Sequence, residues 1–145
     1  MTQEDFIAAL VCRPNASLHD HDDVVANVGE KLRQLPDELQ FQILFPIAVK
    51  SQGRDLPVLD AAILLHRLNP ACPVSCENAV RALLPEWDVS IEQVVFYLAA
   101  RCGSERVKEA TRTVEQQVTT ERDKTTLRTI VYWVHIYDET RTVQS

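Results

Sequence analysis

The sequence has few glycines and no long apolar run, and both shortages exclude whole classes of protein. Three glycines among 145 residues leave no glycine-rich loop that would hold a phosphate group. No stretch approaches the roughly 20 apolar residues that a membrane-spanning helix needs, and no G-x-S-x-G sequence marks a nucleophilic serine. The first six residues carry two acids and no basic group, so we expect no secretory signal and a soluble, cytoplasmic chain.

Basic residues are fewer than acidic ones, 15 against 21, and the formal net charge is −6. Binding to nucleic acid without sequence preference needs clustered lysine and arginine, so this balance argues against a nucleic-acid partner. The basic residues between positions 101 and 128 alternate with acids, and Glu105 and Lys108 form a helix-surface pair at i, i+3. This pattern is typical of a solvated helix surface.

Hydrophobic residues make up 46% of the chain, which is enough for a core and argues against disorder. The length fits a single domain over residues 1–145. Periodicity and capping signals predict helices along nearly the whole chain, so we expect an all-α fold with seven or eight helices. The predicted helices cover residues 2–12, 20 or 21 to 35, 36–51, 55 or 57 to 68, 75–84, 91–102, 104–118 and 120–137.

The boundaries of these helices follow from capping residues and prolines. Thr2 with Asp5, Ser90 with Gln93, and Thr120 with Asp123 have the spacing of capping boxes, and Ser104 is expected to cap the seventh helix. The third helix contains Pro46, which removes one backbone hydrogen bond. Within it, residues 39–45 also alternate as a strand would, and a strand there is the alternative.

Three predicted helices share one pattern, an apolar anchor followed by two small or polar residues and an apolar run. The three segments read Leu59-Asp-Ala-Ala-Ile-Leu-Leu, Ile91-Glu-Gln-Val-Val-Phe-Tyr and Leu127-Arg-Thr-Ile-Val-Tyr-Trp, with anchors 32 and 36 residues apart. Over residues 36–137 the chain resembles small helical-repeat domains of the HEAT-like or armadillo-like type. The resemblance implies stacked antiparallel helical hairpins and an extended surface for a partner. An irregular helical bundle is the alternative, because each buried helix of a bundle shows a similar apolar run.

The densest polar cluster lies at residues 19–23. Its candidate metal ligands are His19, Asp20, His21 and Asp23. Imidazole and carboxylate are the usual ligands of divalent metals, and His66 or His135 would complete such a site from a distance. The alternative is that the aspartates cap a helix and that the histidines are solvated.

The four cysteines are expected to be thiols in a reducing compartment. They are Cys12, Cys72, Cys76 and Cys102. The spacing of Cys72 and Cys76 suits one side of a zinc site, whereas simple burial on apolar helix faces explains Cys12 and Cys102. Cys76 stands near a predicted helix start, where the helix dipole lowers the pKa of a thiol.

Trp87 lies between Glu86 and Asp88 in a predicted turn. A large aromatic side chain in an acidic turn is a candidate anchor for a partner, with the two acids beside it. The alternative is that Trp87 folds back over the preceding helix as part of the core. Trp133 and Tyr137 are expected to pack in the core or between helices.

The sequence shows no catalytic motif, so we expect a non-catalytic protein–protein interaction module without a cofactor. Its acidic charge suits an inhibitor or immunity-type protein for a basic partner, because acids would steer the encounter. The alternative function is a metal-dependent hydrolase that uses the residues 19–23 cluster and a divalent metal. Pairing of apolar end helices into a homo-oligomer is a further alternative.

Overall fold

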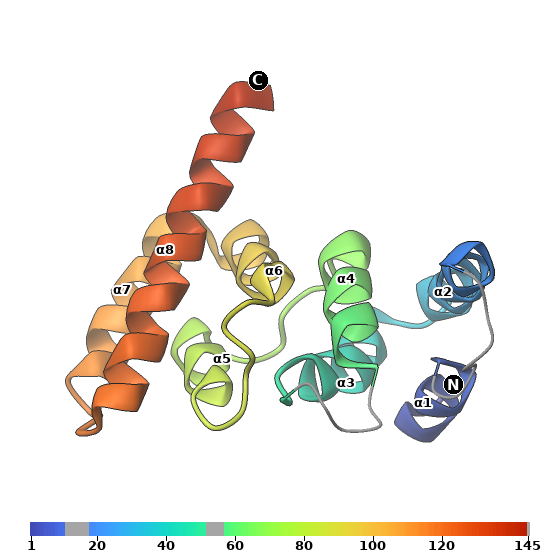
Figure 1. The fold of residues 1–145 in the computed structure, drawn as a ribbon, viewed down its shortest axis with the longest axis horizontal. Coiled ribbons are helices and arrows are strands. Elements are labelled where there is room, and N and C mark those ends of the chain that lie inside the picture. The colour runs from blue at the N-terminus through green and yellow to red at the C-terminus, as the bar shows by residue number, and fades with distance from the viewer. Residues whose placement is uncertain (11–17, 52–56, 145) are drawn as a thin grey trace. The chain divides into compact units, whose positions relative to one another are not determined.

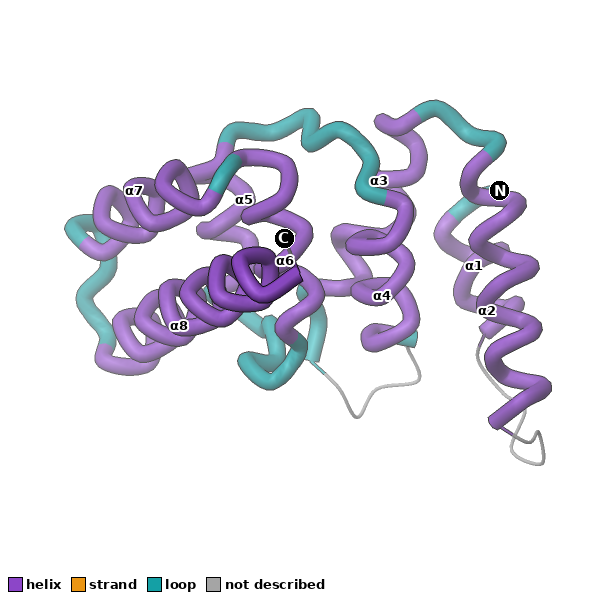
Figure 2. The backbone as a smooth tube through the Cα atoms, turned by 90° about the horizontal axis from the view of Figure 1, so that it is seen from above, coloured by secondary structure: helices purple, strands orange, loops and turns teal. Residues whose placement is uncertain are grey.

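The chain is helical throughout the part that its structure describes. The computed structural model describes residues 1–10, 18–51 and 57–144, and it describes only the backbone of residues 18–21 and 142–144. These ranges contain eight helices and no strand (Figures 1 and 2), which confirms the all-α prediction. The strand alternative for residues 39–45 is wrong, because this segment lies inside a helix. Within the same ranges, no helix is long and apolar enough to cross a membrane.

Two compact units make up the chain, Met1–Pro73 and Val74–Ser145, and the expectation of one domain stays a prediction. The helices of the first unit are α1 (Gln3–Leu10), α2 (Leu18–Arg33), α3 (Asp37–Ala48) and α4 (Val58–Leu68). In this unit α1 packs against α2 and α3, and α4 packs against α2 and α3. Fully buried side chains from all four helices form the core, among them Phe6, Leu32, Leu44, Leu64 and Leu65.

The first helix begins with the predicted capping box. The backbone N–H of Asp5 donates to Thr2 Oγ1 at 3.1 Å, and the backbone N–H of Thr2 donates to Asp5 Oδ2 at 3.0 Å. These bonds satisfy donors that a first helical turn otherwise leaves unpaired. The hydrogen bonds from the Thr2 backbone and side chain also hold the pKa of the Asp5 carboxyl below its ordinary value.

Pro46 stands in the last turn of α3, which ends at Ala48 and not at the predicted residue 51. Because proline has no N–H, the carbonyl of Gln42, four residues earlier, lacks its usual donor within the helix. The side chain of Gln3 on α1 supplies one, with its Nε2 atom 2.7 Å from the Gln42 oxygen. The proline therefore creates an acceptor that fastens α1 to α3.

Replacing Gln3 by alanine is expected to lower the free energy of unfolding of the first unit by about 0.5–1 kcal/mol, the net worth of one hydrogen bond. In a Pro46→Ala background, the N–H of residue 46 again reaches the Gln42 carbonyl, so Gln3→Ala should cost less there. A double-mutant cycle by urea unfolding measures this coupling. Equal costs in the two backgrounds would show that Gln3 does not replace the missing donor.

The second unit repeats the helix contacts of the first and adds one between its second and third helices. Its helices are α5 (Cys76–Leu83), α6 (Glu92–Cys102), α7 (Ser104–Glu115) and α8 (Glu121–Gln144). Here α5 packs against α7 and α6 packs against α8, while α7 contacts both α6 and α8. The core includes Val80, Leu83, Tyr97, Leu98, Val107 and Ile130. In stacked hairpins the first helix packs on the third helix and the second helix packs on the fourth. The resemblance to HEAT-like or armadillo-like domains stays a prediction.

Two predicted caps in the second unit are wrong, because both serines bind elsewhere. Ser90 donates its backbone N–H and its hydroxyl to Asp88 Oδ1, at 2.9 and 2.6 Å, and Ile91 precedes α6 without a side-chain cap. Ser104 is already the first residue of α7, and Gly103 precedes it with a φ of 94°. Such a φ strains any residue that carries a Cβ, so glycine here lets α6 and α7 join through a single residue.

The last helix is longer than predicted, since α8 continues to Gln144 instead of ending near residue 137 (Figure 1). It begins as predicted at Thr120, whose Oγ1 accepts the backbone N–H of Asp123 at 3.2 Å. Several threonines inside the helix donate their hydroxyls to the carbonyl four residues earlier, namely Thr126, Thr129 and Thr140. These bonds satisfy the hydroxyl groups within the helix and explain why the many threonines do not end it.

Candidate protein-interaction surface

The nine aromatic side chains of the sequence divide into a buried set and one partly exposed set. Five are at most 6% exposed and belong to the cores of the two units: Phe6, Phe41, Phe45, Trp87 and Tyr97. The other four lie together on α6 and α8, and we call them the aromatic face: Phe96, Tyr132, Trp133 and Tyr137. Tyr132 is the most open of the four, with an exposed fraction of 55%.

Ring contacts hold the aromatic face together across two helices. The ring centroid of Phe96 lies 6.3 Å from that of Trp133, edge to face, and 5.6 Å from that of Tyr137. The ring centroids of Tyr132 and Trp133 are 5.0 Å apart, and the guanidinium carbon of Arg141 lies 5.4 Å from the centroid of the Tyr137 ring. Tilted rings at such distances attract each other by about 0.5–1.5 kcal/mol beyond their burial. The face is therefore pre-arranged before any partner binds.

Hydrogen bonds from α8 fix the turn that borders the aromatic face. Trp133 Nε1 donates to the carbonyl of Val89 at 2.7 Å, and Arg122 donates to the carbonyl of Pro85 at 2.6 Å. These two bonds attach both ends of the segment 85–89 to α8. Val89 is itself 42% exposed, so a further apolar residue adjoins Trp133 at the surface.

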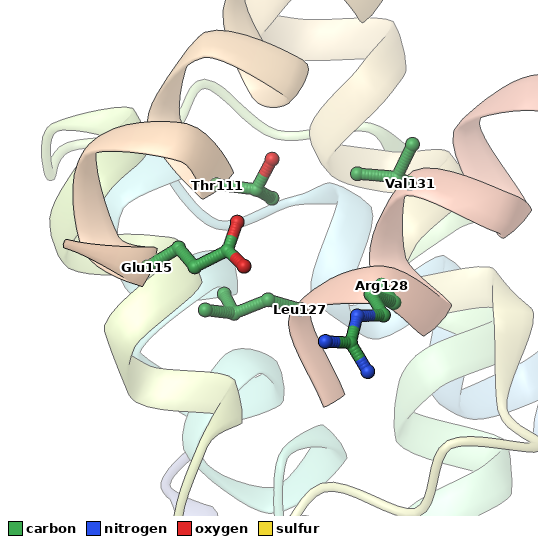
Figure 3. Close-up of a pocket in the computed structure, with 5 residues that line it drawn as sticks. All are labelled: Thr111, Glu115, Leu127, Arg128 and Val131. Atoms are coloured by element: carbon green, nitrogen blue, oxygen red, sulfur yellow. The ribbon is translucent and has the colours of Figure 1, made fainter. Parts of the chain in front are cut away.

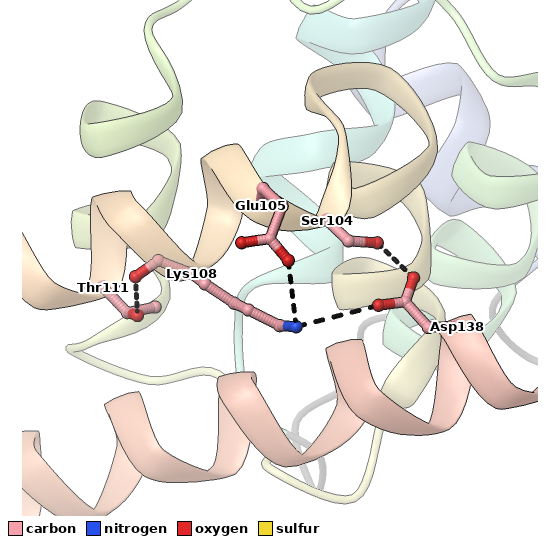
Figure 4. Close-up of polar contacts among 5 residues, drawn as sticks. All are labelled: Ser104, Glu105, Lys108, Thr111 and Asp138. Carbon is pink, nitrogen blue, oxygen red and sulfur yellow. Dashed lines mark hydrogen bonds and ion pairs between the residues drawn. The ribbon is translucent and has the colours of Figure 1, made fainter.

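Charged and polar groups lie at the edge of the aromatic face, where Asp138 follows Tyr137 on α8. One carboxylate oxygen of Asp138 accepts a hydrogen bond from the Ser104 hydroxyl, and the other lies 3.8 Å from Lys108 Nζ (Figure 4). Lys108 also pairs with Glu105 at 3.4 Å, as the i, i+3 spacing predicts. An apolar centre with a polar edge is the usual composition of a protein interface.

A small pocket lies between α7 and α8. Figure 3 shows the residues that line it, Thr111 and Glu115 from α7 and Leu127, Arg128 and Val131 from α8. Its volume of about 210 Å³ is below the roughly 300–1,000 Å³ of small-molecule sites. The hydroxyl of Thr111 already donates to the Lys108 carbonyl at 2.6 Å. Neither the size nor the lining of this pocket indicates a substrate or cofactor site.

Trp87, which the sequence placed as a candidate partner anchor with Glu86 and Asp88, is a core residue. Its side chain is 5% exposed, and its indole Nε1 donates to the carbonyl of Ile91 at 3.1 Å. The interpretation of Trp87 as an exposed anchor is wrong, and the alternative of a core position is confirmed. Burying the indole removes a large apolar area from water while its one N–H keeps a partner. A partner-binding role for Glu86 and Asp88, which are half-exposed, stays a prediction.

The predicted metal ligands are His19, Asp20, His21 and Asp23. All four lie in the first two turns of α2, which begins at Leu18 and so starts earlier than the predicted residue 20. The side chains of the first three lie outside the described residues, and that of Asp23 is exposed. Among the residues whose side chains are described, no three His, Cys, Asp or Glu groups come together to hold a metal. The hydrolase alternative and the zinc interpretation of Cys72 and Cys76 stay predictions.

His66, predicted as a distant metal ligand, is half-buried on α4, whereas His135 is exposed on α8. Burial lowers the pKa of His66, because surroundings of low dielectric disfavour the imidazolium form. The folded first unit therefore holds His66 neutral at a pH at which the unfolded chain already protonates it.

Acidification is expected to destabilise the first unit partly through His66. Because the folded pKa of His66 lies below its ordinary value of 6.5, the unfolded chain binds more protons as the pH falls through this value. The free energy of unfolding should fall accordingly, and His66→Gln should flatten that dependence below about pH 6.5. Urea unfolding at several pH values measures the slopes, with His135→Gln as the exposed control. The same slope in His66→Gln and in the parent would contradict the assignment.

The sequence predicts Trp133 and Tyr137 in the core or between helices, and it does not predict the aromatic face. Part of that assignment describes real contacts, since both residues pack against Phe96 between α6 and α8. The missed signal is the doublet of Tyr132 and Trp133. Consecutive residues of an α-helix point about 100° apart, so two adjacent large aromatics cannot both point to the centre of the same core.

Comparisons of the chain with protein-family models, with curated proteins and with solved structures found no match.

Proposed function

We propose that this chain is a non-catalytic protein-interaction module and that the aromatic face binds its partner. The observation that carries the proposal is the clustering of the four partly exposed aromatic residues in one place, while the other five are buried. Contiguous apolar surface is unfavourable in water and usually marks a binding site. Tyrosine and tryptophan are also the residues that most often dominate the free energy of protein association.

The aromatic face is suited to tight binding because little of it must be ordered on association. Phe96 already contacts both Trp133 and Tyr137, and Trp133 is further fixed by its bond to the Val89 carbonyl. Each flexible side chain that is immobilised on binding costs about 0.5–1.5 kcal/mol. A pre-arranged face avoids most of this cost.

The net charge of −6 favours a basic partner. The first unit contains ten acidic and six basic residues, and the second contains eleven and nine. Long-range attraction from these acids would speed the encounter, while the aromatic contacts would slow dissociation. An acidic inhibitor or immunity-type protein for a basic enzyme combines these two properties.

The proposal is tested by capture of a partner from the lysate of the source cells on three immobilised baits. The baits are the parent chain, Tyr132→Ser on the aromatic face, and Leu59→Ser as a matched control, since Leu59 is an apolar residue of α4 that is 44% exposed. We expect the parent and Leu59→Ser to retain the same protein, Tyr132→Ser to lose it, and added salt to weaken its capture.

Two results would overturn parts of this proposal. Retention of the same protein by Tyr132→Ser would remove the aromatic face as the binding site. Sedimentation that shows a dimer of the parent, and a monomer of Tyr132→Ser, would identify a second copy of the chain as the partner in place of a basic protein.

A further inference from the structure

Two thiols that are 26 positions apart in the sequence meet in the second unit. Cys76 is the first residue of α5, and Cys102 is the last residue of α6. The two side chains are hydrogen-bonded to each other. Cys76 Sγ also lies 3.8 Å from the carbonyl oxygen of Arg106 on α7, a second acceptor for its single proton. The ends of three helices therefore converge on this pair.

Local structure at both helix ends fixes the positions of the two cysteines. Ser75 caps α5, because its hydroxyl oxygen accepts the backbone N–H of Asn78 at 3.2 Å, and this sets Cys76 at the first helical position. On the other side, Gly103 turns the chain from α6 into α7 through one residue. This tight link keeps Cys102 beside the first turns of α7.

The two thiols differ in exposure and in acidity. Cys76 is 3% exposed, whereas Cys102 is partly open to solvent. The hydrogen bond from Cys76, helped by the positive charges of Arg106 and Arg101, lowers the pKa of Cys102 to about 7 against the opposing effect of burial. The same hydrogen bond and burial raise the pKa of Cys76. Near neutral pH, the reactive thiolate is therefore on the accessible residue of the pair.

We propose that Cys76 and Cys102 form an oxidation site at which a peroxide converts the thiol pair into a disulfide. In the first step, the Cys102 thiolate attacks one oxygen of hydrogen peroxide, so that an S–O bond forms and the O–O bond breaks. Cys102 becomes a sulfenic acid, and the hydroxide that leaves takes up a proton to form water.

In the second step, the Cys76 sulfur attacks the Cys102 sulfur. The S–S bond forms, the S–O bond breaks, and the hydroxyl of the sulfenic acid leaves with the thiol proton of Cys76 as a second water molecule. The two thiols together lose two electrons and two protons, and one peroxide is reduced to two waters. Cys102 is thus the attacking residue and Cys76 the resolving one.

The disulfide would join two helices that pack mainly against other helices, α5 against α7 and α6 against α8. Closing the loop between residues 76 and 102 restricts the unfolded chain, so oxidation should raise the melting temperature of the second unit. Reduction of the bond should return the melting temperature to its starting value.

The test is to treat the full chain with hydrogen peroxide, alkylate the remaining thiols, digest the protein and map the linked peptides by mass spectrometry. We expect one linkage, between Cys76 and Cys102, which a dithiol reductant reverses. In Cys76→Ser, Cys102 should stop as a sulfenic acid that dimedone traps, and in Cys102→Ser, Cys76 should stay a thiol. Cys72→Ser is the matched control, and it should form the same linkage as the parent.

Any one of three other outcomes would overturn the proposal. A linkage that involves Cys12 or Cys72 in place of Cys102 would assign the reaction to different thiols; Cys12 lies outside the described residues. Oxidation of Cys102 to the sulfinic acid without a linkage would show that Cys76 does not resolve it. Full recovery of both thiols, under conditions that oxidise free glutathione, would show that the pair is not reactive. The parent chain alone decides these outcomes, so a variant that fails to fold does not affect them.

Discussion

Trp87→Ala is expected to lower the free energy of unfolding of the second unit by about 3–5 kcal/mol, the usual cost of truncating a buried tryptophan. The indole is 5% exposed and donates its N–H to the Ile91 carbonyl at 3.1 Å. Truncation therefore leaves a cavity and also removes the partner of a buried carbonyl. Urea unfolding followed by far-ultraviolet circular dichroism measures the loss.

Trp87→Phe is the matched control, because phenylalanine fills much of the space but has no N–H. It should cost about 1–3 kcal/mol, less than alanine, mainly because the Ile91 carbonyl loses its donor. Both variants should still bind the partner wherever they remain folded. A loss below about 1 kcal/mol for Trp87→Ala would contradict the core position of this residue. Lost binding by a stable Trp87→Phe would restore the anchor hypothesis.

Tyr132→Ala is expected to weaken binding of the partner by about 30-fold, which corresponds to roughly 2 kcal/mol and is the threshold of an interface hot spot. Tyr132 is the most exposed member of the aromatic face, and its ring contacts Trp133 at 5.0 Å. Its truncation should speed dissociation more than it slows association. Surface plasmon resonance with the purified partner measures both rates.

Tyr132→Ala should lower the free energy of unfolding by at most about 1.5 kcal/mol, the value of the lost ring contact with Trp133, because the side chain is 55% exposed. Leu59→Ala, which changes a comparably exposed apolar residue of α4, should leave both rates unchanged. An affinity of Tyr132→Ala within twofold of the parent's, about 0.4 kcal/mol, would place the interface elsewhere. An equal effect of Leu59→Ala on the affinity would also place the interface elsewhere.

The existence of the helices could be predicted from the sequence because their signals are local. The capping box of Thr2 and Asp5 and the cap at Thr120 lie within one helical turn, and both hydrogen-bond as predicted. The apolar spacing of each helix also depends only on near neighbours in the chain. These short-range signals were sufficient for the all-α class.

Helix ends were less predictable where a distant residue competes for the capping group. The hydroxyl of Ser104 bonds to Asp138, 34 positions away in the sequence. Gln3 and Gln42 meet only because α1 packs on α3. No spacing rule predicts such contacts, since they depend on the packing of the whole unit.

The candidate sites depend even more on long-range packing. The aromatic face needs Phe96 of α6 beside Trp133 and Tyr137 of α8, and the thiol pair needs Cys76 beside Cys102. In the sequence, each of these residues taken alone looks like any other helix residue with apolar neighbours. Their chemistry follows from which helices the fold brings together.

The central claim is that a protein partner binds on the aromatic face, and amide hydrogen exchange with and without the captured partner tests it most directly. Binding should slow exchange in the segments that carry the face, around residues 89–96 at the start of α6 and residues 129–137 of α8. Exchange in α1–α4 should be unchanged. Slower exchange confined to the first unit, or to α5 and α7 alone, would contradict the claim.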